Sequence, residues 1–85
     1  MTELTRSQIR DLMAQVMKTQ GMELPDDDTA GLREIGFRSL NFSELAIRVE
    51  DEIGTELNFD AVSLRRIATV ADVLDFLEQL QKNPG

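Results

Sequence analysis

Residues 34–57 of this chain read EIGFRSLNFSELAIRVEDEIGTEL. The apolar residues in this stretch recur at the spacing of one helix face, which predicts an amphipathic helix from about Ser39 to Ile53. Gly54 follows directly and suits the left-handed position that ends many helices. The inward positions are Leu45, Ala46, Val49 and Ile53, and the outer face carries Asn41, Glu44, Arg48, Asp51 and Glu52.

A second amphipathic helix is predicted near the start of the chain. Thr5 can cap it with Gln8 at the reciprocal capping-box position, and Leu4 with Ile9 can form a hydrophobic staple. Gly21 is expected to end this helix. Its apolar stripe consists of Ile9, Leu12, Met13, Val16 and Met17.

A third long helix is predicted near the end of the chain. Thr69 can cap this helix, with Asp72 at its third position. Its apolar face consists of Val70, Val73, Leu74, Leu77 and Leu80.

The segments between the three predicted long helices contain a long loop and a short helix. Pro25 opens a polar loop that runs to about Arg38, and a short helix is expected around Ala61 to Ile67. The loop residues that can pin it onto the helices are Leu32, Ile35 and Phe37. The sequence therefore predicts an all-α fold, a small four-helix bundle of three main helices plus one short helix with a long first loop. We expect one domain over residues 1–85 with its core from about 4 to 80.

The charge and composition narrow the functional classes. The 85 residues include 16 acidic and 9 basic ones, for a net charge of −7, which disfavours nucleic acid and anionic membranes and favours proteins with basic patches. The chain has no Cys and no His, so thiolate nucleophiles, the usual zinc sites and the commonest general base are excluded. The run Asp26-Asp27-Asp28 does not fit a calcium loop, because the twelfth position counted from Asp26 is Phe37. We expect no catalytic residue and no metal site. The start lacks a signal-like apolar stretch, so we expect a cytoplasmic protein. We also expect a monomer, because the small chain has a complete set of helices and needs no partner to close its core.

The segment Ile35-Gly36-Phe37-Arg38-Ser39-Leu40 resembles the carrier-protein signature Leu-Gly-x-Asp-Ser-Leu. The run from Thr69 to Leu77 likewise looks like the last helix of that family, and the similarity extends from the first helix to about Leu80. The chain is thereby identified as similar to the acyl carrier proteins, in a free-standing form, because no flanking domain is evident in it.

This resemblance implies a carrier without catalytic activity. A phosphopantetheinyl transferase would move 4'-phosphopantetheine from coenzyme A onto Ser39, and the arm would carry acyl or polyketide intermediates as thioesters. Acyl transferases, ketosynthases or ligases with basic docking patches would be the partners. Ser39 also suits this role physically, because the unpaired N–H groups and positive dipole at a helix N-terminus stabilise a phosphodiester. The alternative is an ordinary N-cap serine.

The resemblance also assigns a docking surface to the helix that starts at Ser39. Leu40 and Ile47 match apolar contact positions of the family. The matching acidic contact positions are Glu44, Glu50, Asp51 and Glu52. A solvated helix face is the alternative interpretation of these acids.

Arg38 departs from the family, which commonly has Asp before the modified serine. That Asp is implied to help the transferase recognise its target. Arg38 is a candidate contact for the phosphate of the arm, because a guanidinium forms charge-assisted hydrogen bonds to phosphate. The alternative is an exposed Arg without a role.

Other functional readings share part of this pattern. A peptidyl or aminoacyl carrier of nonribosomal peptide synthesis has the same fold and arm, and a helical protein-interaction adaptor would use Ser39 only as a cap. An enzyme would have to work with carboxylates and serine alone. The residues that could shelter a cargo, or simply form the core, are Phe42, Leu45, Ala46, Val49, Leu57, Phe59, Ile67, Val73 and Leu74.

Overall fold

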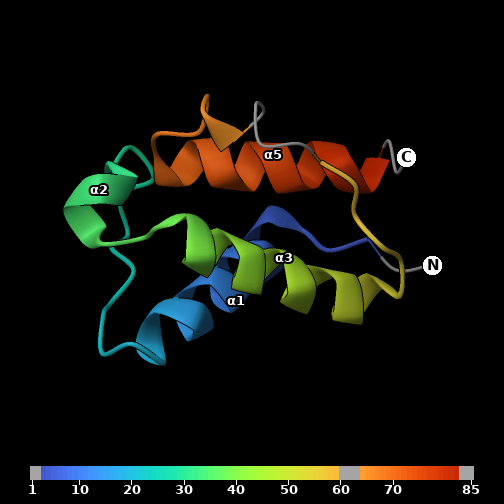
Figure 1. Cartoon of the computed structure of the whole chain (residues 1–85), viewed down its shortest axis with the longest axis horizontal. Helices are drawn as coiled ribbons and strands as arrows, with labels where there is room; N and C mark the ends of the chain where they lie inside the picture. Colours follow the sequence, from blue (N-terminus) through green and yellow to red (C-terminus); the bar gives the residue numbers. More distant parts are fainter. Residues whose placement is uncertain (1–2, 60–63, 83–85) are drawn as a thin grey trace.

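The computed structural model describes residues 3–59 and 64–82 as a small bundle of helices (Figure 1). Its described helices are α1 (Arg6–Lys18), α2 (Leu32–Ile35), α3 (Ser39–Ile53) and α5 (Val70–Lys82). Figure 1 shows that α3 and α5 run in the same direction and that α1 runs against them. The predicted all-α bundle is confirmed. In the described ranges no helix is both long and apolar enough to cross a bilayer.

The ends of α1 are closed by the groups that the sequence predicts. Gln8 donates its backbone N–H to Thr5 Oγ1 at 3.2 Å, and Thr5 donates its own to Gln8 Oε1 at 2.8 Å, which completes the capping box. Gly21, at φ 74°, adopts the left-handed conformation after the helix. The N–H of Met22 then bonds to the carbonyl of Met17 at 3.0 Å. α1 is therefore fixed at both ends by local bonds.

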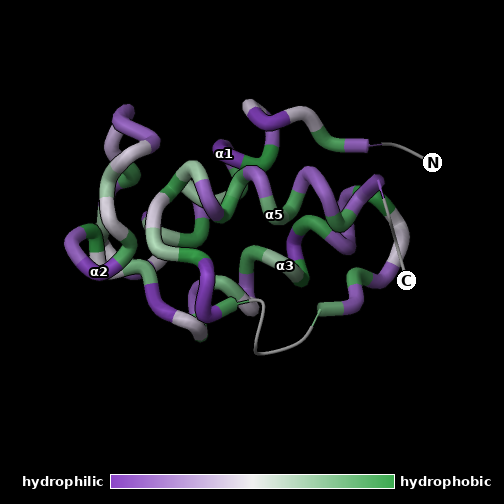
Figure 2. The backbone as a smooth tube through the Cα atoms, turned by 90° about the horizontal axis from the view of Figure 1, so that it is seen from above, coloured by the Kyte–Doolittle hydropathy of each residue, from purple (hydrophilic) through white to green (hydrophobic). Residues whose placement is uncertain are grey.

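The core lies between the apolar faces of α1, α3 and α5. Figure 2 shows hydrophobic and hydrophilic positions alternating along each of these helices, as their helical period requires. Side chains with no exposed surface come from all three helices, so the predicted inward faces meet in one core. They are Ile9, Met13, Val16 and Met17 of α1, Leu45 and Val49 of α3, and Val70, Val73, Leu74 and Leu77 of α5.

The long first connection is more ordered than the sequence predicts. It contains the single helical turn α2 where we expected a loop as far as Arg38, and α2 packs its Leu32 and Ile35 against the core. Leu32 donates its N–H to the carbonyl of Ala68 at 2.9 Å, and Gly31 forms an isolated antiparallel bridge with Thr69. The connection is therefore attached to the chain just before α5.

The start of α5 has the predicted cap. Thr69 Oγ1 accepts the N–H of Asp72 at 3.2 Å, and Asp72 Oδ2 accepts the N–H groups of Ala68 at 2.9 Å and Thr69 at 3.0 Å. These bonds lower the pKa of Asp72 below its ordinary value, and the hydrogen bond from the backbone of Ala68 contributes most. The capping residues thus hold the same short segment that pairs with Gly31.

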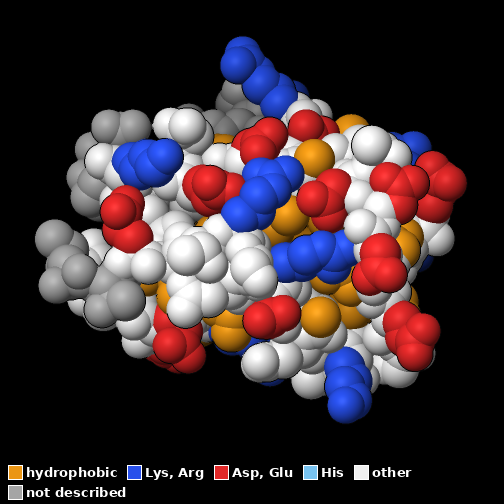
Figure 3. Space-filling model, turned by 180° about the vertical axis from the view of Figure 1, so that it is seen from behind, with side chains coloured by type: hydrophobic (Ala, Val, Ile, Leu, Met, Phe, Trp, Pro, Cys, Tyr) orange, Lys and Arg blue, Asp and Glu red, His pale blue; other side chains and the backbone are white. Residues whose placement is uncertain are grey.

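Ion pairs join α1 to the first connection and to α5. Arg6 lies 3.8 Å from Asp28, 2.5 Å from Asp75 and 3.0 Å from Glu78, and Arg10 lies 3.3 Å from Asp28. Arg10 also donates to the carbonyl of Pro25. Figure 3, which views the molecule from behind, shows basic and acidic side chains interleaved on that face.

The predicted short helix at 61–67 falls partly outside the described residues, since 60–63 are not described. In its described remainder Leu64 is helical and a turn follows, in which Ile67 donates its N–H to the carbonyl of Leu64 at 3.2 Å.

Candidate functional site

Ser39 is the first residue of α3, and Arg38 occupies the N-cap position. Arg38 has extended backbone, and its carbonyl accepts the N–H of Phe42 at 3.0 Å. The Ser39 side chain is exposed, and its hydroxyl makes no hydrogen bond within the described ranges. The interpretation of Ser39 as an N-cap is therefore wrong, because the helix begins one residue too early for its hydroxyl to cap it.

Asn41 stabilises this helix start from inside. Its Oδ1 accepts the backbone N–H of Arg38 at 2.8 Å, and the residue is only 3% exposed. We predicted Asn41 on the outer face of the helix, and that was wrong, because its side chain turns back to the N-terminus. The backbone N–H groups of Ser39, Leu40 and Asn41 have no acceptor among the residues that the structure describes. They form the positive end of a 15-residue helix.

Gly36 explains the turn that delivers Ser39 to the surface. Its φ of 81° is left-handed, and it ends α2 with the N–H of Phe37 bonded to the carbonyl of Leu32 at 2.9 Å. A Cβ at Gly36 would lie 2.7 Å from Met22 Sδ, so the Met22 side chain would have to shift to admit it. Phe37 then anchors in the core, which turns the next two residues outward.

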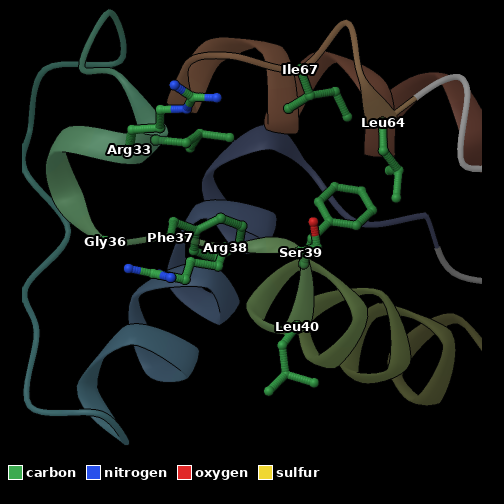
Figure 4. Close-up of a pocket in the computed structure, with 10 residues that line it drawn as sticks. Arg33, Gly36, Phe37, Arg38, Ser39, Leu40, Leu64 and Ile67 are labelled. Carbon is green, nitrogen blue, oxygen red and sulfur yellow. The ribbon is translucent and has the colours of Figure 1, made fainter.

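A pocket of about 700 Å³ opens beside Ser39, between α2, the start of α3 and the turn before α5. Figure 4 shows the Ser39 hydroxyl on the side of α3 that faces Leu64 and Ile67, and Leu40 on the opposite side. Most of the remaining lining is apolar, but two arginines also line the pocket, Arg33 from α2 and Arg38. Figure 4 shows the Arg38 side chain extending away from the Ser39 hydroxyl.

The predicted docking residues on α3 fall into two groups. Leu40 is 79% exposed and Ile47 is 56% exposed. Among the described residues, these two are the large hydrophobic side chains that are exposed to solvent. Glu44 lies between them on the same stripe and pairs with Arg48 at 3.2 Å. Asp51 continues this stripe one turn beyond Ile47 and is exposed. We call Leu40, Glu44, Ile47 and Asp51 the α3 stripe.

Glu50 and Glu52 lie outside the α3 stripe. Glu50 is half-buried, and its Oε2 accepts the N–H of Leu57 at 2.7 Å, which ties the chain beyond Gly54 back to the helix. This internal bond depends on the path of the chain after the helix, which no local pattern gives. Glu52 is exposed. A docking role for either residue stays a prediction.

Most of the residues named as a cargo shelter form the core. Leu45, Val49, Val73 and Leu74 have no exposed surface. Phe42 and Ile67 instead line the pocket beside Ser39. The ring of Phe42 also contacts those of Phe59 and Phe76, with centroids 5.6 and 5.8 Å away. Phe76 was not singled out from the sequence, although it lies in the run from Thr69 to Leu77, nor was Leu64, which lies in no quoted motif.

Asp27 and Asp28 of the first connection have different partners, Asp27 within its own turn and Asp28 on α1. Asp27 Oδ1 accepts from the Thr29 hydroxyl at 2.6 Å and from its backbone N–H at 2.9 Å, and these bonds lower the pKa of Asp27. Asp28 faces Arg6 and Arg10.

Comparison with known proteins identifies the family. The family model described as "Phosphopantetheine attachment site" matches residues 7–77, so the chain belongs to the family of phosphopantetheine-binding carrier proteins. An acyl carrier protein of Phaeodactylum tricornutum (strain CCAP 1055/1) is 47% identical over 47 residues, which are 55% of this chain and 59% of that protein. The match thus spans about three-fifths of that relative. No solved structure matches the chain.

The predicted family and its cofactor are thereby confirmed. Family membership implies a covalently attached 4'-phosphopantetheine, and carriers of this family are generally not catalysts. The surroundings of Ser39 fit such a group, because they combine an unbonded hydroxyl, helix N–H groups without acceptors and an adjoining pocket. The phosphodiester root would be held by the start of α3, and the arm would supply the thiol that bonds the cargo.

Proposed function

We propose that the chain is an acyl carrier protein that holds acyl or polyketide intermediates as thioesters on a phosphopantetheine arm at Ser39. The observation that carries this proposal is the exposed Ser39 hydroxyl at the first position of α3, with no hydrogen bond among the described residues. A hydroxyl without an internal partner is available to a transferase. The negative phosphodiester formed on it is stabilised by the helix N–H groups and dipole.

The α3 stripe supports docking of partner enzymes. Exposed Leu40 and Ile47 offer an apolar contact, and Glu44 and Asp51 add charge complementary to basic patches. A phosphopantetheinyl transferase and acyl-handling enzymes such as acyl transferases, ketosynthases or ligases are the proposed partners. Arg48 reduces the negative charge of the stripe through its pair with Glu44. We also propose a cytoplasmic monomer, which cell fractionation and light scattering can check.

The test is an intact mass measured after incubation with coenzyme A and a broad-specificity transferase. We expect the mass of one phosphopantetheine group to be added to the parent and none to Ser39→Ala. Ser43→Ala is the matched control, because Ser43 is also exposed on α3 but lies one turn further on, and it should be modified like the parent. Modification that persists in Ser39→Ala would overturn the assignment.

The docking proposal uses the same transferase. Reversing Glu44 and Asp51 to Lys should slow association and weaken its dependence on salt, with little change in melting temperature. Asp11→Lys with Glu23→Lys is the control, since both residues are exposed and lie off α3. Equal association rates for the two double variants at low salt would place docking elsewhere.

A further inference from the structure

Two arginines beside Ser39 have no acidic partner. Arg6, Arg10 and Arg48 each lie within 4.0 Å of a carboxylate, whereas Arg65 and Arg66, in the turn before α5, also have no ion pair among the described residues. Arg33 and Arg38 line the pocket, yet neither side chain makes an ion pair or hydrogen bond with the described residues. Their position sets Arg33 and Arg38 apart, because these two guanidinium groups line the pocket beside Ser39 and are available to a negatively charged ligand there.

The two arginines differ in where they point. Both arginines line the pocket, but Figure 4 shows Arg33 reaching from α2 towards the turn that carries Ile67, whereas Arg38 extends away from Ser39. The neighbouring acid Glu34 does not neutralise Arg33. Its Oε1 instead folds over Gly31, where it would lie 2.7 Å from a Cβ on that glycine. Arg33 is therefore the cation placed across the pocket from the attachment residue.

The rest of the pocket suits a carbon chain. Its lining between Ser39 and Arg33 includes the apolar residues Phe42, Leu64 and Ile67. A volume of about 700 Å³ is in the range of sites that enclose small molecules. The pocket thus combines an attachment point, apolar walls and an opposing guanidinium.

We infer that this pocket receives a cargo whose free end carries a carboxylate, and that Arg33 determines this specificity. The inference rests on the proposed attachment at Ser39. Guanidinium binds carboxylate through parallel hydrogen bonds, and the apolar wall covers the carbons between the thioester and that carboxylate. The phosphodiester is stabilised by the start of α3, which leaves Arg33 for a second negative group. The tether makes this weak contact intramolecular.

The experiment loads the full chain with two cargoes of equal length. A broad-specificity transferase attaches a phosphopantetheine arm that carries either a glutaryl or a pentanoyl group. Each group is joined to the arm by an amide in place of the thioester, which prevents hydrolysis, and the intact mass of the protein confirms that the arm is attached. We expect the glutaryl form to shift the Arg33 Nε–Hε resonance. We also expect it to melt on the order of 4 °C above the pentanoyl form, the size of a partly exposed charged contact in a small domain.

Variants separate a specific contact from general charge. Arg33→Gln should remove the difference between the cargoes, and Arg33→Lys should retain part of it. Lys18→Gln removes the same charge outside the pocket and should keep the full difference. Equal melting and equal Arg33 shifts for both cargoes would overturn the inference while leaving attachment at Ser39 intact. If the arm without cargo shifts the Arg33 Nε–Hε resonance as far as the glutaryl form does, Arg33 contacts the phosphodiester instead and the inference is wrong. A parent chain that gains no arm would overturn the proposed function itself.

Discussion

Gly36 controls the turn that leads into Ser39, and its contribution to stability can be measured by comparison with a second left-handed glycine, Gly54. Gly36→Ala forces a left-handed alanine and brings its Cβ 2.7 Å from Met22 Sδ, whereas Gly54, at φ 71°, has no atom within 4 Å of such a Cβ. We expect Gly54→Ala to lose about 1–2 kcal/mol from backbone strain alone. Gly36→Ala should lose about 1 kcal/mol more, the low end for overpacking, because the Met22 side chain has to shift, and it should slow modification of Ser39.

The measurement is the free energy of unfolding in urea, with the rate of phosphopantetheine transfer followed by mass. Equal losses of stability in both variants would show that the Met22 contact carries no energetic weight.

Arg38 occupies a position that favours a different residue. It is the N-cap of α3, but its side chain cannot accept a hydrogen bond. Arg38→Asp supplies a carboxylate acceptor for an N–H of the first turn and a negative charge at the positive helix end. We therefore expect a gain of about 1 kcal/mol in stability and faster modification by a broad-specificity transferase.

Arg38→Asn separates the two effects, because it caps without charge. It should show most of the stability gained by Arg38→Asp. If the transferase recognises the negative charge, Arg38→Asn should be modified no faster than the parent. A rate in Arg38→Asp no higher than in the parent would contradict the recognition role implied by the family.

The position of an individual residue could be predicted from the sequence where it depends only on its neighbours in the chain. Ser39 could be placed at a helix start because Gly36 and the apolar spacing of the next turns are sequence signals. The burial of Asn41, the bond from Leu57 to Glu50 and the position of Arg33 across the pocket could not be predicted. The burial of Asn41 and the position of Arg33 depend on segments distant in sequence, and the bond from Leu57 depends on the path of the chain after α3.

At the scale of elements, the start of α5 makes stability depend on pH. Hydrogen bonds from Ala68 and Thr69 lower the pKa of Asp72, so the folded state favours its ionised form. The contribution is complete above the ordinary pKa of an aspartate and is lost as the pH falls through the lowered value. At pH 7, Asp72→Asn should therefore lose about 0.3–1 kcal/mol, the usual value of a charge at a helix N-terminus.

Urea unfolding at a series of pH values from 7 down to 3 measures this effect. The gap between Asp72→Asn and the parent should narrow as the pH falls, because the parent then also becomes neutral. Asp51→Asn, on the exposed α3 stripe, controls for general loss of charge. A gap that stays constant over the series would exclude ionisation as its cause.

The long helices could be predicted from their own residues, whereas α2 could not. Thr5 with Gln8 and Thr69 with Asp72 are local caps, and each helix adds a full apolar stripe. α2 has only four residues, too few to be stable alone, and it depends on the bond to Ala68 and on core contacts. Leu32 and Ile35, three residues apart before Gly36, were the available signal.

At the scale of the whole molecule, Arg6 joins three segments that are far apart in sequence. It contacts Asp28 of the first connection and Asp75 and Glu78 of α5 from its place at the start of α1. Removing it leaves Asp75 and Glu78 without a cation in a chain of net charge −7, whereas Asp28 keeps its pair with Arg10. The same connection continues through α2 to Gly36 and Ser39, so its attachment also fixes the site.

We therefore expect Arg6→Ala to destabilise the fold by about 1 kcal/mol, the upper end for exposed pairs, because its side chain is 39% exposed and several charges act together. Arg48→Ala is the control, since it breaks one ion pair within α3 and one exposed hydrogen bond to Gln15 of α1, and it should cost only about 0.5 kcal/mol. Urea unfolding at low and high salt measures both. Salt screens the repulsion among the remaining carboxylates, so the loss in Arg6→Ala should shrink at high salt more than the loss in Arg48→Ala. Equal losses in the two variants, unaffected by salt, would mean that the connection is held by its backbone bonds to Ala68 and Val70 and by core packing alone.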